Sequence, residues 1–248
     1  MKRIATIICS AMLMATFAMA GTAMAKKTYV NGIDLNFPPY GYVDKTGQPA
    51  GFDVESMNWI AEKFGFDVKH QPMDWSGIVP ALVSGKIDLI ASGMSITDER
   101  KKVVNFSIPY KVVKQVMVVK NGVDTPAVDF LTTNKRLGVQ RGTTAMGWLE
   151  ENKDKYNYTL VIYDSSPLAV QDMVMGRVDA CPMDDTIAEE VAKAKPVKVI
   201  GEFGQPSENY GYAVRKEDKE LLGMINKGLE MLMKDPHWKE LKKKYDLQ

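Results

Sequence analysis

The pattern that decides the fold lies in one segment, Asp74-Trp75-Ser76-Gly77-Ile78-Val79-Pro80-Ala81-Leu82-Val83-Ser84-Gly85-Lys86-Ile87-Asp88-Leu89-Ile90. Its acidic and hydroxylic start predicts a helix from Asp74 to Ser84, and Gly85 predicts the end of that helix. The stretch from Ile87 to Ile90, apolar apart from Asp88, predicts a buried strand directly afterwards. A helix followed at once by a buried strand is typical of α/β layers, in which helices cover a sheet.

The second half of the chain repeats this unit. Asp164 and Ser165 precede a predicted helix at residues 167–175, Gly176 closes the helix, and a strand is predicted at residues 178–181. Gly85-Lys86-Ile87-Asp88 in the first unit corresponds to Gly176-Arg177-Val178-Asp179 in the second. The repetition predicts two lobes of similar construction. Because ligands bind beyond the carboxyl ends of strands in such sheets, we expect a cleft between Gly93 and Asp184.

Strand-like and helix-like segments alternate along the rest of the chain. Residues 37–51 form a turn-rich segment without a predicted strand. Further strands are predicted at residues 28–34, 66–70, 111–120, 136–140, 158–163, 196–200 and 210–215, and further helices at residues 54–64, 98–103 and 145–155 and in two stretches at the end of the chain.

The first 25 residues predict export. Lys2 and Arg3 are followed by an uncharged apolar run and then by Ala23-Met24-Ala25, a small-residue cleavage pattern. A transmembrane anchor is the alternative interpretation, but the run is short for a membrane span and basic residues flank both its ends. We therefore expect a signal peptide at residues 1–25 and a mature protein in the periplasm.

Charge and composition narrow the classes of function. The chain has 32 basic and 31 acidic side chains, and loss of Lys2 and Arg3 would leave 30 and 31, a balance that argues against a nucleic-acid partner. Only Cys181 would remain of the cysteines, and the two histidines, His70 and His237, lie far apart in sequence. We expect no disulfide, no metal site, no cofactor and no catalytic residues.

The segment Ser92-Gly93-Met94-Ser95-Ile96-Thr97-Asp98-Glu99-Arg100 is the sharpest candidate for a binding site. A buried strand ends here, a turn of small residues follows, and a helix begins with Ser95 or Thr97 as its cap. Arg100 opposes the dipole of this helix. It is either a solvated surface arginine or part of an anion site, in which helix amides and the guanidinium converge on one carboxylate.

Five groups of motifs follow one another along the chain. In order, they are Gly51-Phe52-Asp53-Val54-Glu55, residues 72–82, residues 96–102 with 104–107, Gly138-Val139-Gln140-Arg141-Gly142-Thr143-Thr144, and Arg177-Val178-Asp179-Ala180. Together these motifs resemble the periplasmic solute-binding proteins of family 3, in particular the polar amino-acid branch with the glutamine and the lysine/arginine/ornithine binding proteins. Ser56 departs from the family pattern, which usually has an apolar residue at that place. The resemblance implies a type II periplasmic binding protein fold of class α/β, with two lobes, a mixed sheet flanked by helices in each lobe, and the ligand in the interlobe cleft.

The resemblance also implies the domain organisation and the partners. Lobe 1 would comprise residues 26–110 and 211–248, and lobe 2 residues 115–205, with hinges near 110–114 and 206–210. Two β-like connectors permit hinge closure without disrupting either core. The implied function is that of a monomeric amino-acid-binding component of an ABC importer, whose partners are a free amino acid and a membrane permease.

Roles for individual residues follow from the resemblance as well. Arg100 would bind the α-carboxylate of the ligand, together with the backbone amides of Ser95 and Thr144. The α-ammonium would be held by Asp184, the Gly93 carbonyl and the Ser95 hydroxyl. This division suits a zwitterion leaving water, which needs an opposite charge at each end.

The pocket for the ligand's side chain would contain Asp34, Phe37, Trp75 and Gln140, with Met183 beside them. Asp34 favours a side chain that donates hydrogen bonds, either an amide or a cation. Met183 stands where the glutamine binder has histidine, and Gln140 stands where other members have lysine or leucine. These positions leave the identity of the amino acid open.

Two other classes of function are alternatives. Exported cyclohexadienyl dehydratases share this fold and also bind a carboxylate with arginine, and Asp34 is the one spare carboxyl that could act as their general acid. Receptor ligand-binding domains of the same fold usually carry a further membrane span or signalling domain. The sequence up to Gln248 shows neither, so we expect a freestanding protein, with docking on a chemoreceptor as the variant of this alternative.

Overall fold

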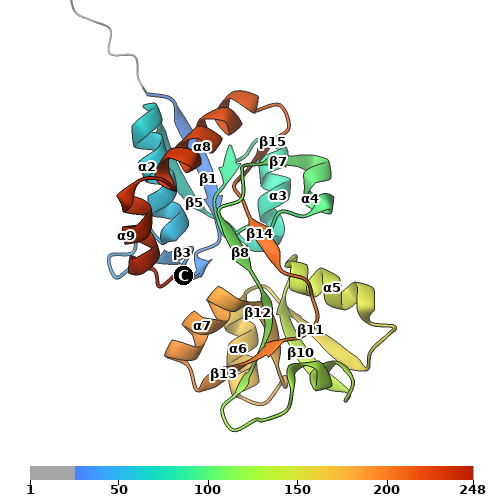
Figure 1. The fold of residues 1–248 in the computed structure, drawn as a ribbon. Coiled ribbons are helices and arrows are strands. Elements are labelled where there is room, and N and C mark those ends of the chain that lie inside the picture. Colours follow the sequence, from blue (N-terminus) through green and yellow to red (C-terminus); the bar gives the residue numbers. More distant parts are fainter. Residues whose placement is uncertain (1–25, 248) are drawn as a thin grey trace, which may run out of the picture.

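The computed structural model describes residues 26–247, which form two lobes joined by two crossing segments (Figure 1). The predicted signal peptide at residues 1–25 lies outside the described residues, as does Gln248. No helix within residues 26–247 combines the length and the apolar character needed to cross a membrane.

Lobe 1, the upper lobe in Figure 1, is built on a five-stranded mixed sheet. Its strand order is β5-β1-β6-β15-β7, in which β1 pairs in parallel with β5 and β6, whereas β15 pairs antiparallel with β6 and β7. The last part of the chain thus returns to lobe 1, where β15 lies between β6 and β7. The strands are β1 (Thr28–Ile33), β5 (Asp67–Pro72), β6 (Leu89–Ile90), β7 (Val104–Phe106) and β15 (Ala213–Arg215).

Helices cover this sheet at the periphery of lobe 1. Close packing of α2 on α8 is possible because Gly228 faces Ile60, where a Cβ atom would lie only 2.6 Å from the Ile60 side chain. Gly65 ends α2 in the left-handed conformation that favours glycine, with φ of 71°. The helices are α2 (Phe52–Phe64), α3 (Trp75–Val83), α4 (Asp98–Val103), α8 (Lys219–Leu232) and α9 (Pro236–Lys244).

The turn-rich segment after β1 forms a small antiparallel sheet that the sequence did not predict. It consists of β2 (Asn36–Phe37), β3 (Gly41–Val43) and β4 (Pro49–Ala50). These strands are two or three residues long, which is too short for an alternating pattern to stand out. The sheet matters because β2 carries Phe37 to the cleft.

Lobe 2 contains a parallel pair, β10-β11, and an antiparallel sheet in the order β12-β9-β13. A bridge between Leu137 and Ala180 joins these two sheets. The strands are β9 (Gln115–Lys120), β10 (Lys135–Gln140), β11 (Tyr158–Tyr163), β12 (Cys181–Asp184) and β13 (Val197–Glu202), and the helices are η1 (Ala127–Leu131), α5 (Thr144–Asn152), α6 (Ser166–Val174) and α7 (Asp185–Ala194).

The two crossings between the lobes correct two of the predicted strands. The run predicted at 111–120 is divided at Lys114 into β8 (Lys111–Val113) and β9, and the run predicted at 210–215 is divided into β14 (Glu208–Tyr210) and β15. The physical reason is that each chain segment leaves one sheet and enters another. Between the lobes, β8 and β14 pair with each other in an antiparallel ladder (Figure 1).

A third correction concerns the region before and after Asp184. The strand predicted at 178–181 begins only at Cys181 and extends to Asp184, and the unpredicted helix α7 follows it immediately. Val178 is buried, but Asp179 donates its backbone N–H to Arg136, so the chain approaches β10 before it enters the sheet. Asp184 then lies at the carboxyl end of β12 and at the N-cap of α7.

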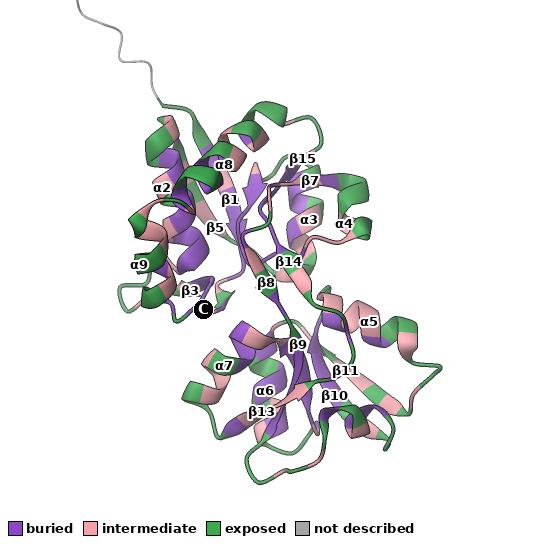
Figure 2. Ribbon diagram, viewed as in Figure 1, coloured by how far each residue is buried: buried purple, intermediate pink, exposed green. Residues whose placement is uncertain are grey.

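Buried residues lie in the interior of each lobe and at the junction between the lobes (Figure 2). One apolar cluster lies within lobe 2, around Phe130, Leu149 and Phe203, and another lies beneath α3 in lobe 1. At the junction, aromatic rings from both crossings pack with rings from lobe 1; they belong to Tyr40, Phe52, Tyr110, Tyr210 and Tyr212.

Candidate functional site

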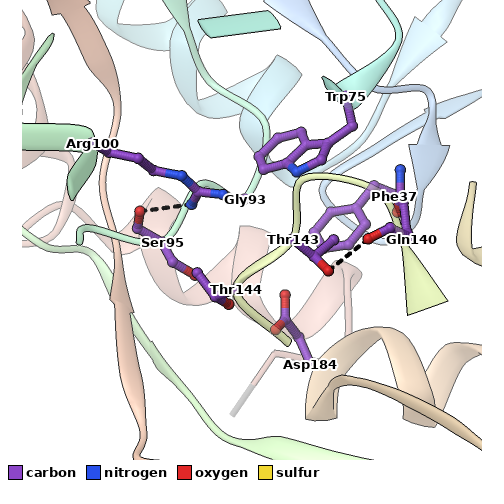
Figure 3. A pocket seen from close by; sticks show the side chains of 9 residues that line it. All are labelled: Phe37, Trp75, Gly93, Ser95, Arg100, Gln140, Thr143, Thr144 and Asp184. Atoms are coloured by element: carbon purple, nitrogen blue, oxygen red, sulfur yellow. Dashed lines mark hydrogen bonds between the residues drawn. The ribbon is translucent and has the colours of Figure 1, made fainter. Parts of the chain in front are cut away.

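A cavity of about 20 Å³ lies where the two lobes face each other (Figure 3). Eight of the nine predicted site residues line it; the ninth, Asp34, lies behind Gln140 and bonds to it. Thr143 is an additional lining residue that the sequence did not indicate. The lining residues are Phe37, Trp75, Gly93, Ser95, Arg100, Gln140, Thr143, Thr144 and Asp184.

Arg100 reaches this cavity from the start of α4. Thr97 caps the helix, because its hydroxyl accepts the Arg100 backbone N–H at 3.1 Å. The guanidinium donates to the Ser95 carbonyl at 2.9 Å and to the Gly142 carbonyl of lobe 2 at 3.1 Å. It also lies 5.4 Å from the centroid of the Trp75 ring, so the interpretation as a solvated surface arginine is wrong.

Acidic side chains near Arg100 partly offset the cost of burying its positive charge. Burial lowers the pKa of the guanidinium, and the negative charges of Glu208 and Asp184 oppose that shift. Arginine stays protonated in proteins, so Arg100 presents a fixed positive charge to the cavity.

Asp184 faces the same cavity from lobe 2. Burial raises the pKa of its carboxyl to about 6, although a hydrogen bond from Tyr210 opposes the rise. The neighbouring charge of Glu208 raises it further. Tyr210 donates to Oδ2 and the Gln115 amide donates to Oδ1, so Asp184 is held in one orientation from two sides.

Gly93 and Ser95 supply the lobe 1 side of the cavity. Gly93 has φ of 57°, and a Cβ atom there would lie 2.7 Å from the Phe37 ring, so both its conformation and its surroundings favour glycine. Ser95 is buried, and its hydroxyl donates to Glu208 at 2.6 Å. Glu208 was missed by the sequence analysis, which considered residues 206–210 only as a connector.

Asp53 supports this region from behind. It is fully buried and accepts hydrogen bonds from the Gly93 backbone N–H at 2.6 Å, from Tyr110 at 2.9 Å and from Tyr212 at 3.1 Å. Burial raises its pKa to about 7, and these three donors oppose that rise. Asp53 therefore ties the Gly93 turn to both crossings. The motif Gly51-Phe52-Asp53 was noticed in the sequence only as part of the resemblance.

The opposite end of the cavity is aromatic and polar. The rings of Phe37 and Trp75 lie nearly parallel, with centroids 6.3 Å apart and an angle of 13° (Figure 3). The Gln140 amide donates to the buried Asp34 carboxylate at 2.9 Å, and its carbonyl accepts from Ser166 at 2.8 Å. Asp34 is thus not a solvated turn residue. Met183 is also buried and packs in the same apolar cluster as Phe37.

The titratable residues between 26 and 247 do not form a metal-binding group: no cluster of three or more His, Cys, Asp or Glu side chains is arranged to hold an ion. The charged and polar side chains that line the cavity can recognise a ligand by charge and hydrogen bonding. A cation and an anion, on different lobes, face one small cavity.

Known proteins resemble this chain over almost its whole length. A probable histidine-binding protein of Neisseria gonorrhoeae is 30% identical, over 97% of this chain and 93% of its own. The L-arginine-binding protein of Pseudomonas aeruginosa is 33% identical, over 90% of each chain. The structure of an ancestral arginine-binding protein bound to arginine superposes with a TM-score of 0.82 at 39% identity, covering 89% of this chain and 98% of that one.

These similarities confirm the predicted α/β fold of the type II periplasmic binding proteins. They also confirm a binding protein, not an enzyme, because all three relatives are described as binders. The model of the bacterial extracellular solute-binding proteins, family 3, matches residues 29–248. With the two-lobed fold and a charged cavity between the lobes, the chain belongs to the family 3 bacterial extracellular solute-binding proteins.

Proposed function

We propose that the protein captures a free L-amino acid between its lobes and hands it unaltered to the membrane permease of an ABC transporter. The observation that carries this proposal is the placement of Arg100 and Asp184, opposite charges on different lobes, around one cavity. A zwitterion leaving water needs such a pair. Arg100 and the backbone amides of Ser95 and Thr144 would bind the carboxylate, while Asp184, the Gly93 carbonyl and the Ser95 hydroxyl would bind the ammonium.

Capture requires movement of the lobes. A cavity of about 20 Å³ has room for about one water molecule, so the lobes must separate before an amino acid can enter. We place the hinges at β8 and β14, near residues 110–114 and 206–210, with residues 26–110 and 211–248 as one body and 115–205 as the other. A ligand that contacts both bodies favours the closed state by its differential affinity.

The charges around the cavity favour an amino acid with a basic side chain. Arg100 is one positive group, whereas three acidic groups, Asp34, Asp184 and Glu208, either line the cavity or bond to residues that line it. A ligand with one net positive charge compensates this excess better than a neutral one. The parallel faces of Phe37 and Trp75 suit a planar cation, so arginine is the leading candidate and an amide side chain the second.

A thermal-shift screen against the twenty common L-amino acids tests the proposal. A ligand that binds only the native protein stabilises it by about 2.7 kcal/mol at one hundred times its dissociation constant. We expect a large shift with L-arginine and smaller shifts with other basic or amide amino acids. If none of the twenty raises the melting temperature at millimolar concentration, the protein is not an amino-acid binder.

We further propose that the mature protein acts as a monomer in the periplasm, because one chain supplies the complete site and residues 1–25 have the pattern of a signal peptide. The mass of the protein isolated from the periplasmic fraction should correspond to a chain that begins at Lys26. Light scattering should give the mass of one chain. Retention of the full-length chain in the membrane fraction would contradict cleavage.

A further inference from the structure

Glu208 connects the two lobes directly at the binding cavity. It lies on the crossing strand β14, and a single carboxylate oxygen, Oε2, accepts hydrogen bonds from hydroxyls on both sides. The Ser95 hydroxyl of lobe 1 donates to it at 2.6 Å, and the Thr144 hydroxyl of lobe 2 donates at 2.8 Å. Ser95 and Thr144 line the cavity, whereas Glu208 stands immediately behind them.

The other contacts of Glu208 place it beside Asp184. The side-chain nitrogen of Gln115 donates to Glu208 at 3.3 Å and also to Asp184, so one amide bridges two carboxylates. Gln205 donates to the second oxygen of Glu208 at 2.9 Å. All four hydrogen bonds to Glu208 thus come from neutral donors. Two neighbouring negative charges bridged by an amide favour a cation in the adjacent cavity.

The hydroxyl of Ser95 has one hydrogen and two lone pairs. Because a carboxylate only accepts, the Ser95 hydrogen must point to Glu208, and the lone pairs are left for another donor. We propose that Glu208 is a positioning residue that orients the ligand, by holding the Ser95 hydroxyl as an acceptor for the α-ammonium while its bond to Thr144 draws the second lobe to the same point.

This arrangement sorts the two ends of a zwitterion. An ammonium has only donors and finds the Ser95 oxygen ready to accept. A carboxylate in the same place would meet lone pairs and two further carboxylates, and is directed instead to Arg100. Glu208 thereby contributes to affinity through the amino end of the ligand and not through its carboxyl end or its side chain.

The inference rests on the proposed function, and a comparison of two ligands tests it. L-arginine and 5-guanidinopentanoic acid, which lacks only the α-amino group, are titrated calorimetrically into the wild type and Glu208→Gln. We expect Glu208→Gln to weaken L-arginine binding by about 10- to 100-fold and to change binding of the des-amino compound by less than about threefold. If the screen selects another amino acid, that compound and its des-amino analogue replace this pair.

Glu202→Gln is the matched control, because Glu202 is an exposed acid at the end of β13 that pairs with Lys114. It should bind both compounds like the wild type. Equal losses of both compounds in Glu208→Gln, or no loss of either, would overturn the inference while leaving the proposed function intact. A wild type that binds no amino acid overturns the proposed function itself. If Glu208→Gln does not fold, Glu208→Asp replaces it, because the shorter side chain withdraws the carboxylate by one methylene. The affinities for L-arginine and for the des-amino compound are then compared in the same way.

Discussion

Trp75 and Arg100 donate hydrogen bonds to the same acceptor, the carbonyl oxygen of Gly142, at 3.0 and 3.1 Å. Both donors belong to lobe 1, whereas Gly142 lies in the loop between β10 and α5 of lobe 2. A carbonyl oxygen has two lone pairs and accepts both bonds. Gly142 has φ of 76°, a conformation that favours glycine, so the loop can turn its carbonyl toward the two donors. This shared acceptor closes one side of the cavity.

Trp75→Phe should therefore weaken the closed state without removing the aromatic face. The variant loses the indole N–H that reaches Gly142 but keeps a ring opposite Phe37. We expect a loss of about 1 kcal/mol in binding free energy, seen chiefly as faster ligand dissociation in stopped-flow fluorescence. Trp75→Leu should cost more for L-arginine than for L-glutamine, because a planar cation also loses its ring contact. If Trp75→Phe and Trp75→Leu lose the same binding free energy for L-arginine, the aromatic ring at position 75 contributes nothing.

Arg100→Ala should weaken amino-acid binding severely. Truncating one member of a buried, hydrogen-bonded charge pair costs about 2–5 kcal/mol, which is roughly a 30-fold to 5,000-fold loss of affinity. Arg100→Lys should also bind poorly, because an ammonium lacks the planar fork that holds a carboxylate. Arg141→Ala is the control, since this arginine is half-exposed and makes only a 3.7 Å ion pair with Asp164. Near-normal affinity of Arg100→Ala by calorimetry would remove Arg100 from the site.

Asp184 should make ligand affinity depend on pH. Its pKa is raised to about 6 chiefly by burial, and only the ionised form compensates an ammonium. Affinity should therefore be constant above pH 7 and fall by about tenfold for each pH unit below 6, because binding then releases one proton. Calorimetric titrations between pH 5 and 8 measure this slope, and an unchanged affinity at pH 5 would exclude Asp184 as the ammonium partner.

The same group should affect the stability of the ligand-free protein in the opposite direction. Its pKa lies higher in the folded than in the unfolded chain, so between pH 4 and 6 the folded state binds more protons. Its contribution to the free energy of unfolding rises as the pH falls through this range. Because Asp53 titrates nearby, the test is the difference between wild type and Asp184→Asn in urea unfolding. The free energy of unfolding of the wild type minus that of Asp184→Asn should increase from pH 7 to pH 4.

Asp34→Asn should change which amino acid is preferred. The buried carboxylate of Asp34 holds Gln140 at 2.9 Å, at the end of the cavity beyond the aromatic rings. Removing its charge should weaken binding of arginine and lysine more than binding of glutamine. Asp154→Asn, at an exposed position in lobe 2, is the control. A panel of amino acids that keeps its order of affinity in Asp34→Asn would place Asp34 outside the part of the site that selects the side chain.

Local patterns predicted much of the fold because the decisive signals lie within short segments. The helix that ends before Gly85 and the cap at Thr97 were readable from neighbouring residues, and so was the position of Arg100 at the start of a helix. The division of residues 111–120 was not readable, because β8 and β9 form one continuous β-rich run in the sequence and only the geometry of two sheets separates them at Lys114.

The site was predictable only where a residue's role depends on its own segment or on the resemblance. Glu208 and Gln115 lie 93 positions apart in the chain and meet Asp184 only because both crossings pass the cavity. Each appears in the sequence as an ordinary polar residue in a β-rich stretch. Asp53 is similar, since its partners Tyr110 and Tyr212 lie close together in the fold but far apart in the sequence. Contacts of this kind depend on the tertiary arrangement and leave no local pattern.

The ladder between β8 and β14 also holds a negatively charged side chain, that of Glu208, beside the cleft. Glu208 pairs with Val113 within that ladder. With the hinges at β8 and β14, as proposed above, we expect Glu208 to move little when the lobes open. We therefore expect its negative charge to act on the cleft before the lobes close, from its place behind Ser95. A fixed negative charge at a cleft raises the local concentration of cationic solutes and speeds their arrival, and salt suppresses that effect. We therefore expect the proposed hinge ladder to guide a cationic solute electrostatically, and added salt to slow its association.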